Sequence, residues 1–153
     1  MDELKKRLLW IDSLVDYTAD YRQALRKNGY FIGVSEDAYD AIEKATYRFD
    51  GIFLRPRLEL GTARSSGTYP INPPKATDFD QDFYSAGFWV HKSIRNGGQN
   101  KTVPVFFLTS LPKGDINRER LELVAAYDGF AKMIGMKEIN PDALVKIVKG
   151  MIK

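Results

Sequence analysis

Short apolar runs alternate with amphipathic segments along most of the chain. The apolar runs have the length of buried strands and lie at residues 7–12, 30–35, 51–55, 103–110 and 132–137. Apolar residues at helical spacing predict helices at residues 14–28, 36–47, 87–96, 115–130 and 140–152. Strands that alternate with helices are typical of a parallel sheet covered by helices on both faces. The pattern therefore predicts a single α/β domain built from five βα units.

One segment interrupts this alternation. Residues 58–85 separate the third predicted strand from the third predicted helix, whereas loops from strand to helix usually take about two to six residues. The segment leaves the carboxyl end of a central strand, where open α/β sheets place their functional sites. Two interpretations stay open: a surface loop with no function of its own, or a loop that contacts a partner or ligand.

Composition and charge exclude several classes of function. With 44% hydrophobic residues, the chain can form one compact domain with a core, which we assign to residues 1–153. Zero cysteines and a single histidine exclude disulfides, thiolate nucleophiles and multi-histidine metal sites. The 23 basic and 20 acidic residues are scattered, unlike the basic stripe of nucleic-acid-binding domains. No apolar run could span a membrane and no signal peptide precedes the first strand, so we expect a cytoplasmic protein.

Four short motifs resemble the receiver domains of bacterial response regulators. They are "LLWIDS" at the first strand, "FDGIFLRPRL" at the third, "VPVFFLTS" at the fourth and "MKEINPDAL" before the last helix. The resemblance covers nearly the whole chain except the 58–85 insertion. It implies a flavodoxin-like (βα)5 three-layer sandwich with a parallel five-stranded sheet of order 2-1-3-4-5.

The resemblance also assigns positions to a phosphorylation pocket. In that family, two acids after the first strand bind magnesium, and an aspartate after the third accepts phosphate from a histidine kinase. Asp12 matches the first acid, but Ser13 stands in place of the second and Arg55 in place of the phosphoacceptor. Thr109 matches the hydroxyl residue of the fourth strand.

The fifth strand is matched less well. Lys137 matches the lysine that contacts the phosphoryl group, with Lys132 as the less suitable alternative because it would shorten the strand. Glu138 stands where a proline is usual, and Ile134 occupies the position of the aromatic residue that reports the switch.

These departures remove the chemistry of the family. Arginine has no carboxylate oxygen with which to form an acyl phosphate, and magnesium requires carboxylate oxygens, of which only Asp12 remains. We therefore expect no metal and no cofactor. No pair of nucleophile and base suggests an enzyme, and His91 is expected to be a solvated position on its helix.

Arg55 itself has two possible roles. Its guanidinium could form a permanent ion pair with Asp12 and hold the domain in one state. Alternatively, Arg55, Thr109 and Lys137 could form an anion site for a phosphate-bearing metabolite or the carboxylate of a partner.

The sequence thus favours a pseudo-receiver, a phosphorylation-independent module for regulatory protein-protein interaction in bacterial signal transduction. The expected partner is an effector domain, another protein or a second copy of the chain. By the resemblance, contact would involve the helix at 115–130, the strand at 132–137 and the last helix. The alternative is a sensor of small ligands or anions that uses the pocket and the 58–85 loop.

Overall fold

The five predicted strands form one parallel sheet. The computed structural model describes residues 5–63, 69, 71–74 and 84–152. The strands are paired in the order β2-β1-β3-β4-β5, which confirms the predicted topology. Their bounds are β1 (Arg7–Ile11), β2 (Phe31–Ser35), β3 (Gly51–Leu54), β4 (Val105–Thr109) and β5 (Ala131–Gly135).

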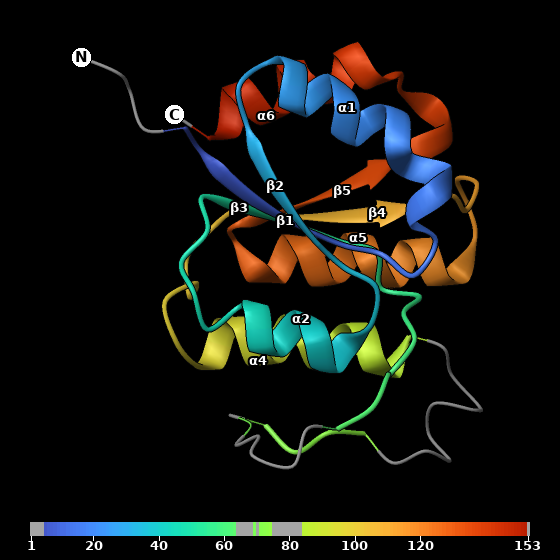
Figure 1. Cartoon of the computed structure of the whole chain (residues 1–153). Helices are drawn as coiled ribbons and strands as arrows, with labels where there is room; N and C mark the ends of the chain where they lie inside the picture. The colour runs from blue at the N-terminus through green and yellow to red at the C-terminus, as the bar shows by residue number, and fades with distance from the viewer. Residues whose placement is uncertain (1–4, 64–68, 70, 75–83, 153) are drawn as a thin grey trace.

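Helices cover both faces of this sheet and make three layers. Figure 1 shows α1 (Ala19–Lys27) and α6 (Pro141–Met151) on one face, and α2 (Ala38–Lys44), α4 (Ser85–Asn96) and α5 (Ile116–Asp128) on the other. Side-chain caps set three of the helix starts, because Asp37, Asp115 and Asn140 each accept a hydrogen bond from a backbone N–H of the first turn. None of the described helices has the length and apolar character that crossing a membrane requires.

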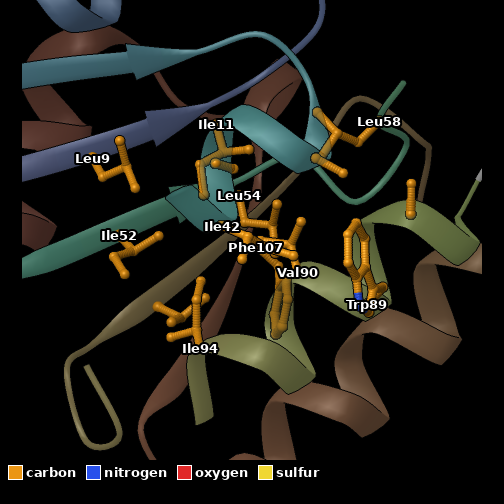
Figure 2. Packing of buried hydrophobic residues seen from close by; sticks show 14 of the residues in the cluster. Leu9, Ile11, Ile42, Ile52, Leu54, Leu58, Trp89, Val90, Ile94 and Phe107 are labelled. Atoms are coloured by element: carbon orange, nitrogen blue, oxygen red, sulfur yellow. The ribbon is translucent and has the colours of Figure 1, made fainter. Parts of the chain in front are cut away.

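A separate apolar core lies on each face of the sheet. Below α1 and α6, the rings of Trp10, Phe53 and Phe106 stack across three neighbouring strands, with centroids 4.6 and 4.7 Å apart. Figure 2 shows the opposite core, where Ile11, Leu54 and other strand residues pack on Ile42 of α2 and Val90 of α4. Fully burying a side chain of this size stabilises the fold by about 1.5–3 kcal/mol. The strands are apolar on both faces because both faces are covered.

The first helix begins later than the sequence predicts. Residues Val15–Thr18 form a 3-10 turn, and α1 starts only at Ala19. The cause is local, because the carboxylate of Asp12 accepts hydrogen bonds from the Leu14 amide and from the Thr18 hydroxyl. These bonds hold the chain in a tight turn directly after β1. A second 3-10 turn, Met136–Glu138, follows β5 and carries Lys137 beyond the end of the strand.

The described parts of the 58–85 insertion pack on α2 and α4. Leu58 is buried, and the Ala38 amide donates to the Glu59 carbonyl oxygen at 2.9 Å. Trp89 of α4 donates its indole N–H to the Ile71 carbonyl oxygen at 2.9 Å, and its ring contacts that of Tyr69. Trp89 thus joins α4 to two described residues of the insertion. Residues 64–68, 70 and 75–83 lie outside the described part of the chain, so the role of the loop stays a prediction.

Candidate functional site

The predicted site residues meet at the carboxyl edge of the sheet, where β3, β4 and the turn after β5 end together. A pocket of about 510 Å³ opens there, and Arg55, Thr109 and Lys137 are among the residues that line it. Asp12 is fully buried and does not line the pocket. The remaining lining comes from Leu14, Tyr17, Arg57, Tyr84, Leu108, Ser110 and Leu111.

The carboxylate of Asp12 is held mainly by neighbouring groups of its own segment. One oxygen accepts from the Leu14 amide at 2.8 Å, and the other accepts from the Thr18 hydroxyl at 2.9 Å. The indole N–H of Trp10 lies 3.5 Å from the second oxygen. The hydrogen-bonding capacity of this buried acid is therefore largely used within the protein.

Arg55 follows β3 and extends its side chain between Asp12 and the end of β4. Its guanidinium Nη1 lies 3.8 Å from the Asp12 carboxylate, so the predicted ion pair is confirmed, although the distance is too long for a direct hydrogen bond. The short contact of Arg55 is with Ser110, whose hydroxyl accepts from Nη2 at 2.6 Å. Sequence reasoning missed Ser110; its only signal was its place directly after Thr109.

Arg22 is a buried cation that also interacts with Asp12. Arg22 of α1 donates to the Thr18 hydroxyl and to the Val15 carbonyl oxygen, both at 2.7 Å. Burial lowers the pKa of Arg22, while the nearby Asp12 carboxylate opposes that shift. Thr18 therefore accepts from Arg22 and donates to Asp12, which links the two charges through one hydroxyl. The helical spacing of Thr18 and Arg22 was the only sequence signal for this arrangement.

Two hydroxyl side chains of the predicted site form hydrogen bonds with backbone groups. Thr109 accepts from the Leu111 amide at 3.1 Å and shapes the exit from β4. Ser13 donates to the Glu36 carbonyl oxygen at 2.8 Å and accepts from the Glu59 amide at 3.0 Å. The residue at the position of the second acid thus joins the loops that leave three neighbouring strands.

The three predicted residues of the β5 region have different surroundings. Ile134 is buried in the core below α1 and α6. Lys137 is exposed and lines the pocket, and no hydrogen bond or ion pair joins it to the part of the chain that the structure describes.

Glu138 forms an ion pair with Arg118 of α5, in which Nη2 donates to a carboxylate oxygen at 3.0 Å and Nη1 to the other. This pairing raises the pKa of Arg118 and lowers the pKa of Glu138. Arg118 also donates to the Leu111 carbonyl oxygen at 2.9 Å. The turn after β5 is therefore tied to the first turns of α5 and to the loop after β4.

The expectation for His91 was wrong. Its side chain is only 12% exposed, and Nε2 lies 2.6 Å from the carboxylate of Asp128 at the end of α5. Arg95 donates two hydrogen bonds to the same carboxylate, at 2.7 and 2.9 Å. The reason is the packing of α4 against α5, which brings together residues far apart in the sequence and leaves no local pattern to read.

No cluster of three or more histidine, cysteine, aspartate or glutamate side chains that could hold a metal ion occurs within residues 5–63, 69, 71–74 and 84–152. The fold is the flavodoxin-like fold of receiver domains. The sequence matches no protein-family model, and it has no significant match among curated proteins.

Solved structures of receiver domains are similar to the chain over almost its whole length. The receiver domain of the sensor histidine kinase PA1611 from Pseudomonas aeruginosa PAO1, which holds a magnesium ion in its active-site cleft, matches with a TM-score of 0.67 and 17% identity. That match covers 97% of this chain and 98% of the other. The chemotaxis response regulator CheY4 of Vibrio cholerae matches with a TM-score of 0.67 and 20% identity, covering 97% and 99%. A two-component response regulator from Clostridium difficile matches with a TM-score of 0.64 and 21% identity, covering 96% and 95%. At these identities the comparison establishes the fold.

Proposed function

We propose that this protein is a pseudo-receiver, a cytoplasmic regulatory module that binds a protein partner without being phosphorylated. The observation that carries the proposal is Arg55 at the end of β3, with its guanidinium 3.8 Å from the buried Asp12 carboxylate. In the receiver resemblance this is the position of the phosphoacceptor. Arginine has no oxygen that could attack a phosphoryl donor.

The environment of Asp12 also argues against magnesium binding. A hard divalent cation needs several oxygen ligands, and the Asp12 oxygens already accept from Leu14 and Thr18. Lys137 and Arg55, both positively charged, line the adjacent pocket. A cation would therefore enter a region of like charge. This contrasts with the magnesium ion held by the Pseudomonas receiver domain.

The interaction role rests on the surface formed by α5, β5 and α6. β5 is an edge strand of the sheet, and α5 exposes 73% of Ile116. The ion pair between Arg118 and Glu138 fixes α5 to the turn after β5. This surface is therefore preorganised, which reduces the entropy lost when a partner or a second copy binds.

A second candidate function is anion sensing at the pocket. Arg55, Arg57 and Lys137 line it together with the Ser110 and Thr109 hydroxyls, and such donors suit phosphate or carboxylate groups. Lys137 favours this function because none of the described residues forms an ion pair with it. A volume of about 510 Å³ is within the range of small-molecule sites.

Amide NMR spectra of the 15N-labelled chain test the two candidates together. We would record them alone, with magnesium, with magnesium plus beryllium fluoride as a phosphoryl mimic, and with inorganic phosphate. The pseudo-receiver proposal expects no shifts at Asp12, Arg55, Thr109 and Lys137 with magnesium or the mimic. Saturable shifts that require magnesium would refute it. Shifts with phosphate alone, lost in Lys137→Ala, would establish the anion site instead.

The variant Arg55→Asp provides the matched comparison. It places a second carboxylate beside Asp12 and removes the cation, so we expect magnesium to shift the amides after β1 and β3 in this variant only. If the variant responds to magnesium and the natural chain does not, Arg55 is the reason that the natural chain does not bind magnesium. Equal responses of the two proteins would contradict that explanation.

A further inference from the structure

A second and larger pocket forms a groove between α4 and α5. Its volume is about 840 Å³, and none of its lining residues lines the Arg55 pocket. It shares α5 with the α5, β5 and α6 surface, but its other wall is α4 and the loop that follows. Figure 1 places both helices on the sheet face opposite α1 and α6.

The α5 side of this groove is unusually apolar for an exposed surface. Leu123 and Tyr127 are 60% and 91% exposed, and Phe130 just after the helix is 48% exposed. Leu123 and Tyr127 are four residues apart, so their side chains lie one turn above the other on the same side of α5. Adjacent exposed apolar side chains beside a groove mark an interaction site more often than scattered ones do.

The charges that line the groove are almost all positive. The cations are Lys92 and Arg95 of α4, Lys101 of the following loop and Arg120 of α5. Among the described lining residues the single carboxylate is Asp128, and it already binds Arg95 and His91. Lys92 and Lys101 are exposed, and no described residue forms an ion pair with either. The groove therefore has unmatched positive charge next to apolar surface.

The groove walls are preformed. Arg95 donates to the carbonyl oxygens of Asn100 and Val103 at 3.1 and 2.7 Å, which holds the loop that carries Lys101 against α4. Between the two walls, the guanidinium of Arg120 from α5 lies 5.2 Å from the ring of Phe88 from α4. Because these contacts exist before binding, a partner would not need to order the surface first.

We propose that this groove binds an acidic amphipathic segment of a partner protein, one that presents Leu or Phe side chains to Leu123, Tyr127 and Phe130 and carboxylates to Lys92 and Lys101. Charge complementarity selects this occupant, and helix-in-groove recognition supplies the geometry. The site shares α5 with the surface of the proposed function, but it uses α4 and the following loop where that surface uses β5 and α6. One can therefore be wrong while the other is right.

The test is an NMR titration of the 15N-labelled full chain with a synthetic amphipathic peptide of about four helical turns. This probe has Leu and Phe on one face and Glu on the other. Two reference peptides replace every Glu by Lys, or every Leu and Phe by Ser. We expect saturable shifts at residues 88–96 and 120–130 with the probe, and binding at least about tenfold weaker with each reference, a difference of about 1.4 kcal/mol.

Paired variants locate the binding surface. Leu123→Ser with Tyr127→Ser removes the apolar wall, and Lys92→Glu with Lys101→Glu reverses the charge; each pair should weaken binding by about tenfold or more. The controls are Tyr47→Ser and Lys146→Glu, which change an exposed ring and an exposed cation outside the groove. These should leave the affinity unchanged.

Three results would overturn the proposal. One is the absence of saturable shifts in the groove, and another is equal binding of the Lys-substituted peptide. The third is binding of a single-stranded oligonucleotide at these residues in place of the acidic peptide, which would assign the cations to phosphate groups.

Discussion

His91 of α4 and Asp128 of α5 share a contact of 2.6 Å in a site where both side chains are largely buried. Burial lowers the pKa of His91, although the hydrogen bond to Asp128 acts in the opposite direction. The hydrogen bonds from Arg95 and His91 lower the pKa of Asp128, against the effect of burial. The folded state therefore favours a neutral imidazole beside an ionised carboxylate.

This pair predicts a loss of stability in mild acid. Because the folded pKa of His91 lies below its ordinary value of 6.5, the unfolded chain binds the proton more readily. The contribution of His91 to the free energy of unfolding should be fully present above about pH 6.5 and should be lost as the pH falls below it. His91 is the single histidine of the chain, so urea titrations from about pH 7.5 to about pH 5 should show this slope in the natural protein and not in His91→Gln. An imidazole that titrates above 6.5 in NMR spectra would contradict the prediction.

Thr18 joins the charges of Asp12 and Arg22, and its removal should be costly. Thr18→Val keeps the shape of this buried side chain but deletes the hydroxyl that donates to Asp12 and accepts from Arg22. Leaving buried polar groups without partners destabilises a protein by about 1–3 kcal/mol. Thr46→Val is the matched control, because Thr46 is exposed and its hydroxyl bonds only a local carbonyl. Equal midpoints of the two variants in urea would count against the hydroxyl link.

Because Gly87 has no side chain, α4 can lie close to the backbone of Pro56, the residue that follows Arg55. A Cβ atom at Gly87 would lie 2.6 Å from the carbonyl carbon of Pro56 and overlap its oxygen. Gly87→Ala must therefore move α4 or the exit of β3, at a cost of about 1–3 kcal/mol. Gly150→Ala in α6 meets no atom within 4 Å and should stabilise the helix by about 0.5–1 kcal/mol. Thermal unfolding of both variants checks the opposite signs.

The elements that the sequence predicted well are those with local signals. Trp10, Phe53 and Phe106 lie within continuous apolar runs, which is the pattern of strands buried on both faces. Asn140 followed by Pro141 marks the start of α6, and the structure places the cap there. These signals depend only on neighbours along the chain, so they indicated the parallel sheet and the order of its helices.

The side-chain partners were harder to predict. Arg55 and Asp12 could be paired because the resemblance placed both at the same edge of the sheet. Ser110 and Arg22 could not be identified as members of the site, because their contacts depend on rotamers and on a turn that the hydrophobic pattern does not encode. The contact of His91 with Asp128 depends on how α4 packs against α5, and one sequence contains no signal for such a distant pair.

The Asp12 and Arg55 pair can be tested by a double-mutant cycle in urea. Asp12→Asn removes a fully buried charge, and Arg55→Gln removes the guanidinium 3.8 Å away. Each variant removes an opposite charge close to its partner, so each should destabilise the fold, whereas Asp16→Asn at an exposed position should have little effect. Arg55 also bonds Ser110, and Asp12 also bonds Thr18. We therefore expect a coupling energy of about 1 kcal/mol between Asp12 and Arg55, which is in the lower part of the range for residues in one network. A coupling near zero would mean that Arg55 does not compensate the charge of Asp12.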